Sequence, residues 1–167
     1  MARAINLRNR ISLLLLAVLA LFSCDGSLVH SYRSVGGEWH KGDTVLFADT
    51  LIYDAPDFVE LFAGVRCSAA YRYKDLWLLV EVLSADAGSV VSRDTVRCAI
   101  YDDDGRLNGA TAGVLYQTEH YVTSLGTSYC NPFHIRLTHL MSDSLLHGVY
   151  DVGVRLVSPC RRLFAGK

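Results

Sequence analysis

Apolar and polar residues alternate with a period of two along most of the chain from Thr44 to Val157. Every second residue is apolar in the runs 59–67, 94–101, 133–138 and 152–156. This period is typical of β-strands that bury one face, and turn residues recur at the spacing of all-β domains. No helical period persists for more than two turns after residue 23. The sequence therefore predicts an all-β fold, a two-sheet antiparallel β-sandwich of about seven or eight strands.

Three local patterns refine this prediction. After its first residue, Asp75, the run 75–83 is apolar on both faces apart from one glutamate, which is typical of a central strand, and we interpret Trp77 within this run as a core residue. The Asp-Gly pair that ends residues 102–105 predicts a hairpin turn. We expect the runs 133–138 and 152–156 to pair as the closing hairpin of the domain.

The first 23 residues have the layout of a lipoprotein signal peptide. A basic segment with three arginines is followed by the short apolar run 11–21 and by Leu21-Phe-Ser-Cys24, which resembles a lipobox. A membrane-spanning helix needs about 20 apolar residues, more than this run contains. We therefore expect cleavage before Cys24 and lipid attachment to that cysteine. Ordinary secretion, with cleavage nearby and an unmodified thiol at Cys24, is the alternative.

Removal of the signal peptide, residues 1–23, leaves 144 residues, which is enough for one domain with a sizeable core. The polar, aperiodic segment 24–38 is expected to be a lipidated tether, 39–160 a single β-sandwich domain and 161–167 a C-terminal tail. Thirteen basic and seventeen acidic residues remain after the signal, a formal charge of −4 that argues against a nucleic-acid partner. The N-terminal lipid is then the only membrane attachment that the sequence predicts.

Four cysteines remain in the chain after the lipobox, an even number that allows two disulfides in three connectivities. A closing hairpin centred near Leu145 places Cys130 opposite Cys160, and we therefore predict a Cys130–Cys160 bridge. Cys67 and Cys98 both fall on core-facing positions of their runs. For this second pair, a bridge and two buried free thiols both stay open.

The sequence carries no recognised motif for catalysis or metal binding. The acidic run 102–104 lacks the ligand spacing of an EF-hand, and none of the six histidines lies in a zinc pattern. The segment 126–130 lacks the second glycine of a nucleophile elbow. We therefore expect no catalytic residues, no metal and no cofactor. The aromatic residues favour recognition, and a candidate platform for sugar stacking or protein binding consists of Trp39, Tyr71, Tyr73 and Trp77.

Four segments, taken in order, carry a family resemblance. Residues 39–47 contain a Trp-x-Lys-x-Asp-x-Val-x-Phe pattern, and residues 73–80 contain a tyrosine followed by Leu-Trp. An Asp-Thr pair and spaced glycines follow in 94–113, and 141–153 runs from a methionine to a Gly-Val segment. Together they resemble the gliding-motility lipoprotein GldH family of the Bacteroidetes. The chain departs from the family pattern at Leu107, where an aromatic residue is expected.

This resemblance implies a non-enzymatic, lipid-anchored envelope protein, an accessory or interaction component of gliding-motility or protein-secretion machinery. It implies contact with an envelope protein partner, for which Trp39, Lys41 and Asp43 are the candidate interaction surface. The residues after Cys24 lack the acidic cluster of many surface-exported lipoproteins, so we expect the protein at the outer membrane with its domain facing the periplasm. The alternative is a carbohydrate-binding β-sandwich lipoprotein of the cell envelope.

Overall fold

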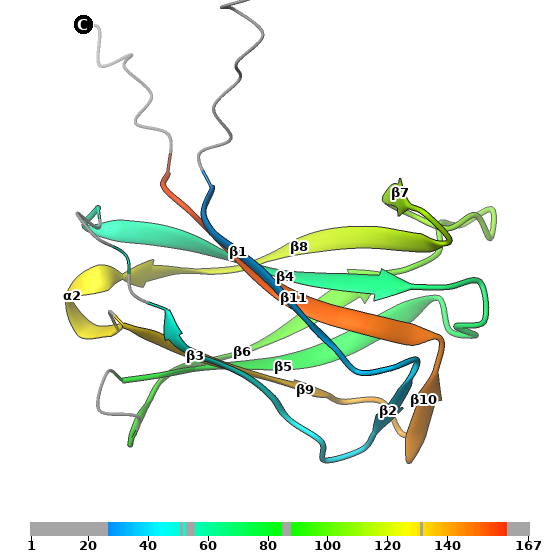
Figure 1. Ribbon diagram of the computed structural model, residues 1–167, viewed down its shortest axis with the longest axis horizontal. Helices are drawn as coiled ribbons and strands as arrows, with labels where there is room; N and C mark the ends of the chain where they lie inside the picture. The colour runs from blue at the N-terminus through cyan, green and yellow to red at the C-terminus, as the bar shows by residue number, and fades with distance from the viewer. Residues whose placement is uncertain (1–26, 51, 53–55, 85–87, 131, 160–167) are drawn as a thin grey trace, which may run out of the picture.

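The computed structural model describes residues 27–50, 52, 56–84, 88–130 and 132–159. Two antiparallel sheets pack face to face, and a two-stranded ribbon lies at one end of them (Figure 1). This arrangement confirms the all-β sandwich prediction. The described residues form eleven strands rather than seven or eight, because three strands have only three residues each. Helix α2 (Thr127–Cys130) is a single turn, and no helix within the described ranges is long and apolar enough to cross a membrane.

The larger sheet has five strands in the order β1-β11-β4-β8-β7. Their bounds are β1 Ser27–Ser34, β11 Val149–Val157, β4 Phe58–Cys67, β8 Leu115–Gly126 and β7 Ala110–Ala112. The smaller sheet has four strands in the order β3-β9-β5-β6, with the bounds β3 Val45–Thr50, β9 Phe133–His139, β5 Asp75–Leu83 and β6 Val90–Ala99. The ribbon pairs β2 (Glu38–His40) with β10 (Leu145–His147).

The core lies between the inward faces of the two sheets. Period-two alternation turns one side of each strand inward, and the inward residues of β4 and β5 are almost fully buried: Val59, Leu61, Ala63, Val65, Cys67, Leu76, Leu78, Val80 and Val82. Burying a valine or leucine side chain contributes about 1.5–3 kcal/mol, so these two strands alone supply much of the driving force for folding. The even positions of β4 and the odd positions of β5 point outward, where they are free to be polar.

The ribbon covers one end of this core. Trp39 on β2 pairs with Leu146 on β10, and both side chains are only 1% exposed. The indole Nε1 of Trp39 donates a hydrogen bond to the backbone oxygen of Asp43, 3.1 Å away, which fixes the turn that leads into β3. In Figure 1 the ribbon spans the gap between the two layers at this end.

The prediction of a tether from residue 24 to residue 38 is wrong for its described part. Residues 27–34 form β1, which pairs with β11 from Ser27↔Val157 to Ser34↔Asp151, so the domain includes at least twelve residues before Trp39. A tether was predicted because this segment is polar and shows no clear alternation in the sequence. Because β1 is the edge strand of its sheet, it needs no continuous apolar face.

The predicted closing hairpin is also wrong. β9 pairs with β3 and β5 in the smaller sheet, whereas β11 pairs with β1 and β4 in the larger one. The connection between them leaves the smaller sheet and forms β10, which pairs with β2, so the chain changes sheets there. The register that predicted the Cys130–Cys160 bridge is therefore absent. Cys160 and the side chain of Cys130 lie outside the described part of the chain.

The Asp-Gly pair forms a turn, but this turn does not join two paired strands, because β6 before it and β7 after it lie in different sheets. Gly105 has a positive φ of 77°, which suits glycine, and its N–H donates to the backbone oxygen of Asp102. The carboxylate Oδ1 of Asp102 accepts hydrogen bonds from the backbone N–H groups of Asp104 and Arg106. Asp102 therefore organises the backbone of this turn, and an isolated bridge pairs Tyr101 with Leu107 across it.

Candidate functional site

A buried carboxylate lies at the centre of the outer face of the four-stranded sheet. Strand pairing places Leu46, Arg136, Glu81 and Arg93 in one row across β3, β9, β5 and β6. Nε of Arg136 donates to Glu81 Oε2 at 2.8 Å, and Nε and Nη2 of Arg93 donate to Oε1 at 2.9 and 2.7 Å. The hydrogen bond from Arg136, reinforced by Arg93, holds the pKa of Glu81 below its usual range. The row therefore keeps a fixed geometry with a net positive charge.

Large apolar side chains are exposed on the same sheet face. Trp77 is 42% exposed and lies opposite Arg97 on β6, while the N–H of Leu140 donates to the Trp77 carbonyl at 2.8 Å. Leu46 and Leu140 are exposed as well. The interpretation of Trp77 as a core residue is therefore wrong. Its odd position on β5 turns it away from the inward-facing Leu76 and Leu78, onto a sheet face that no other described element covers.

The structure separates the three predicted interaction residues. Trp39 is 1% exposed, with its ring 5.1 Å from that of His139, so its role is to fill the end of the core and not to meet a partner. Lys41 and Asp43 are exposed in the turn between β2 and β3. Nζ of Lys41 donates to the backbone oxygen of Ser142 at 3.3 Å, which joins this turn to the segment that follows β9. Two of the three residues thus stay available for contact.

The outer face of the five-stranded sheet is built around two facing glycines. Tyr32, Gly153, Gly64 and Glu119 form one row across β1, β11, β4 and β8. The ring of Tyr32 lies flat over both glycines, since a Cβ at Gly64 would come within 2.3 Å of its hydroxyl oxygen and a Cβ at Gly153 within 2.6 Å of its ring. The hydroxyl donates to Oε1 of Glu119 at 3.4 Å, so the side chains of Tyr32 and Glu119 together span four strands.

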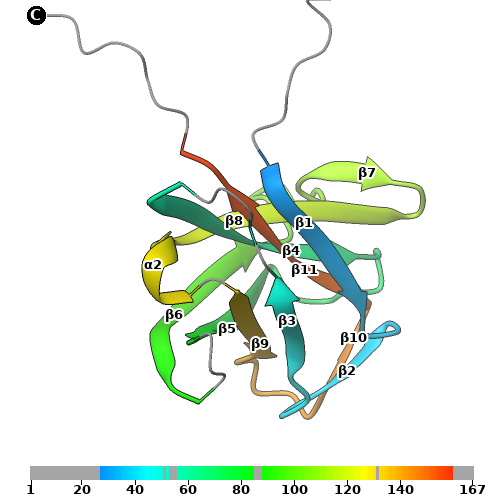
Figure 2. The same ribbon diagram turned by 60° about the vertical axis from the view of Figure 1, so that its left-hand side comes forward.

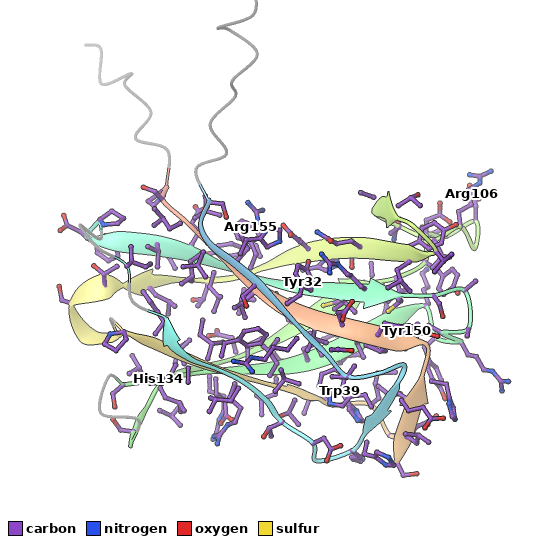
Figure 3. The ribbon with its side chains drawn as sticks, in the orientation of Figure 1. Tyr32, Trp39, Arg106, His134, Tyr150 and Arg155 are labelled. Carbon is purple, nitrogen blue, oxygen red and sulfur yellow. The ribbon has the colours of Figure 1, made fainter. Side chains whose placement is uncertain are left out.

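Arginines hold this tyrosine in place. Cζ of Arg66 lies 3.9 Å from the centre of the Tyr32 ring, a cation–π contact, and Nε of Arg66 donates to Gln117 at 2.9 Å. Nε of Arg155 donates to Oε2 of Glu119 at 2.6 Å. Burial, and then the charge of Glu119, raises the pKa of the Tyr32 hydroxyl, which therefore stays protonated as a donor. In Figure 3 the labelled Tyr32 and Arg155 lie on the upper sheet, whereas His134 lies on the lower one.

The buried cysteines are chemically quiet. Cys67 and Cys98 are free thiols at 1% and 0% exposure, which answers the question that their sequence positions left open. Desolvation raises the pKa of each thiol to about 12. Because the thiolate is the nucleophilic form, these two residues are not suited to covalent catalysis at neutral pH.

Two other features bear on chemistry: a surface hollow and the arrangement of metal-ligating side chains. A surface hollow of about 390 Å³ lies beside the Asp-Gly turn, lined by Tyr71, Arg72, Lys74, Tyr101, Asp102, Asp103 and Gly105. Its two tyrosines are used structurally, because the hydroxyl of Tyr101 donates to the Tyr71 carbonyl and that of Tyr71 to the Asp75 carbonyl. Within the ranges that the structure describes, no group of three or more histidine, cysteine, aspartate or glutamate side chains is arranged to hold a metal ion.

The residues of both outer faces escaped the sequence-based search. Glu81 interrupts an otherwise apolar strand, which was a usable signal for a partnered charge. Gly64 and Gly153 lie inside alternating runs, where a glycine often marks the close approach of another group. No local pattern could reveal that Tyr32 reaches these glycines, because that contact joins segments that are distant in sequence.

Sequence comparison identifies the family. A family model described as GldH lipoprotein matches residues 27–156. The chain belongs to the GldH lipoprotein family. The resemblance read from the sequence is thereby confirmed, and the match covers the whole sandwich from β1 almost to the end of β11. Membership in this lipoprotein family indicates a membrane-anchored protein of the cell envelope.

Two relatives have similar lengths. "Gliding motility lipoprotein GldH" of Flavobacterium johnsoniae is 28% identical over 152 residues, which cover 86% of this chain and 93% of the relative. "Gliding motility lipoprotein GldH homolog" of Christiangramia forsetii is 27% identical over 148 residues, covering 83% and 89%. A solved structure titled "Structure of infectious bursal disease virus Gx strain" matches 83% of this chain and 34% of its own, at 12% identity and a TM-score of 0.27, too low to indicate a shared fold.

Proposed function

We propose that this GldH-family protein is a non-enzymatic, lipid-anchored component of the cell envelope that acts by contact with another envelope protein. In this proposal, lipid on Cys24 holds the domain on the periplasmic side of the outer membrane. The partner belongs to gliding-motility or protein-secretion machinery. The names of the two relatives support gliding motility. A lipid anchor raises the local concentration of the domain at such machinery.

The observation that carries this proposal is the outer face of the four-stranded sheet. It exposes Trp77, four residues along β5 from a row in which Arg136 and Arg93 are fixed on Glu81. Tryptophan and arginine are the residues that most often dominate binding energy at protein interfaces. Because the arginines are already held in place, little side-chain entropy is lost when a partner binds. The chemistry fits a partner surface with apolar groups and an acidic residue.

Crosslinking in native membranes followed by affinity purification tests this function. The full-length protein should recover a specific envelope protein, and Trp77→Ala or Arg93→Ala should reduce that recovery severalfold. Arg106→Ala is the matched control, because Arg106 is exposed and pairs with Asp104 in its own turn. Equal recovery by all three variants would exclude this face. Absence of any specific partner for the unaltered protein would exclude the function.

Carbohydrate binding is the second candidate, and the exposure of Trp77 favours it. Of the four aromatic residues in the proposed platform, Trp39 and Tyr71 are buried, whereas Trp77 and Tyr73 are exposed. The Tyr73 ring packs edge-on against Tyr71, and its hydroxyl is bound to Asp143, so its orientation is set by other contacts. A glycan array should show no binding. Binding that is lost in Trp77→Ala would favour this second function over the first.

A further inference from the structure

The point at which the anchor joins the domain restricts how the domain meets the membrane. Only three Cα–Cα steps separate Cys24 from Ser27, the first residue of β1, and they span at most about 10 Å. Ser27 pairs with Val157 of β11. Figures 1 and 2 show the start of β1 and the end of β11 side by side, on the side of the five-stranded sheet that faces away from the other sheet. A lipid on Cys24 therefore keeps this part of the sheet close to the bilayer.

Exposed apolar side chains gather around this point. Leu28 is 40% exposed in the β-bulge at the start of β1, and Phe58 is 60% exposed at the start of β4. Val157, the partner of Ser27, pairs on its other side with Glu60, two residues beyond Phe58. The first residues of β1 and the first residues of β4 are therefore separated by a single strand, β11. Two strand spacings place them about 10 Å apart.

Tyr121 on β8 extends the same group of side chains. It is 52% exposed, its ring packs edge-on against Phe62 at 5.7 Å, and its hydroxyl lies 3.1 Å from the hydroxyl of Ser124. Ser124 in turn pairs with Glu60, in the row that ends at Ser27. Leu28, Phe58 and Tyr121, which we call the anchor patch, thus come from three strands in the part of the sheet that contains the attachment point.

Several charges on the outer face of this sheet are engaged with one another. Glu119 accepts from Arg155 and lies 3.1 Å from Nε2 of His30, and Arg66 lies 3.7 Å from Asp151. Paired charges can approach the polar headgroup region at less cost than isolated ones. Two acidic residues lie close to Phe58 along the chain: Asp57, which is exposed, and Glu60, which is half-buried in the sheet.

We propose that the anchor patch rests in the headgroup region of the same bilayer that holds the lipid of Cys24. The outer face of the five-stranded sheet then lies toward the membrane, and the face that exposes Trp77 points away from it. This inference rests on the lipid anchor of the proposed function. Aromatic side chains with a polar end, such as Tyr121, prefer the interface between lipid and water, and Leu28 and Phe58 add apolar area. The patch sets orientation, while the acyl chains supply the attachment.

Depth-dependent fluorescence quenching tests this orientation. The full-length lipidated protein is reconstituted in vesicles of phosphatidylethanolamine and phosphatidylglycerol, with or without brominated acyl chains. Phe58→Trp is compared with Leu46→Trp, which places the same probe at an exposed position on the opposite sheet. Native Trp39 is buried and native Trp77 points away, so the unaltered protein gives the background. Brominated lipid should quench the added emission of Phe58→Trp strongly and that of Leu46→Trp hardly at all.

The possible outcomes separate the inference from its premise. Mass spectrometry of the N-terminal peptide establishes whether Cys24 carries lipid, and Cys24→Ala shows whether vesicle binding depends on it. If Cys24 carries no lipid, the anchor and this orientation fail together. If the protein is lipidated and bound but both probes are quenched alike, only the orientation fails. Crosslinks between copies at position 58 would instead mean that a second copy covers the patch, which also overturns the proposal.

Discussion

Two glycines decide what the outer face of the larger sheet presents. A side chain at Gly64 or Gly153 would occupy the space in which the Tyr32 ring lies. Glycine inside a strand normally weakens it, by about 0.5–1 kcal/mol relative to alanine. Here that cost is offset by the Tyr32 ring, which extends over both glycines from the edge strand β1 and contacts Arg66 and Glu119. The glycines are therefore best understood together with Tyr32 as one unit.

Replacement of Gly64 by alanine tests this unit. The added Cβ would lie 2.3 Å from the Tyr32 hydroxyl oxygen, so the ring has to move off the sheet. We expect Gly64→Ala to lower the free energy of unfolding by about 1–3 kcal/mol, measured by urea denaturation. In a Tyr32→Ala background the same change should be neutral or stabilising, because alanine is then only a better strand residue. Equal losses in both backgrounds would show that the glycine is needed for another reason.

Two histidines, the buried His139 and the half-buried His120, predict acid sensitivity. Nε2 of His120 is buried without a hydrogen-bond partner in the described part of the chain, and the polar group that favours the charged form of His139 most is the backbone of His40. Desolvation lowers the pKa of both side chains below the usual 6.5. The backbone of His40 raises the pKa of His139 and Lys41 lowers it, and the smaller effects of Asp43 and Asp143 raise it without reversing the shift. Below pH 6.5 the unfolded chain therefore binds more protons than the folded one.

The sign of this effect is fixed by the lowered pKa. Stability is complete above pH 6.5 and falls as the pH drops below it, by at most about 1.4 kcal/mol per pH unit for each histidine. Urea denaturation at pH 7.5 and 5.5 measures the loss. His139→Leu should reduce the loss, whereas the exposed control His147→Leu should not. The same loss in His139→Leu and in the unaltered protein would assign the acid sensitivity to other groups.

The two tryptophans show what a sequence pattern can and cannot say about one residue. Trp77 sits in an apolar run and suggests core, whereas Trp39 sits among charged residues and suggests surface, yet the structure reverses both. The outer side of the run around Trp77 is apolar although it is exposed to solvent. Trp39 is buried because β2 folds over the end of the sandwich, a tertiary event that neighbouring residues do not encode.

At the scale of elements, β1 is the largest revision of the sequence-based view. Its alternation is weak because an edge strand buries little, and its partner β11 lies more than a hundred residues away. Backbone pairing with β11 predicts slow exchange for those amides between Val29 and Arg33 that face β11, which alternate along the edge strand. Hydrogen-exchange mass spectrometry of the lipidated protein would measure it, with the denatured protein as the fully exchanging reference. Exchange of all the β1 amides as fast as in the denatured protein would restore the tether interpretation.

At the scale of the whole molecule, the all-β sandwich followed from the sequence, but the strand partners did not. Period-two alternation states which side chains share a face, and this held for β4, β6, β9 and β11. It does not state which strand lies next to which, because many pairings satisfy the same alternation. The closing hairpin failed for this reason, since β10 carries the chain from one sheet to the other. The side-chain rows on the two outer faces could not be predicted from the sequence either, because each row joins residues from four strands.

The way Tyr32 crosses the sheet has a mechanical consequence. With the proposed lipid on Cys24, any tension between the membrane and the domain enters through the first residue of β1, an edge strand whose hydrogen-bonded partner in the described sheet is β11. A pull away from the sheet would break those hydrogen bonds one after another, which needs little force. Tyr32 crosses β11 and β4 and is held by Arg66 and Glu119, so it ties the loaded strand to three others. Its ring shares the load across the sheet before the edge can peel.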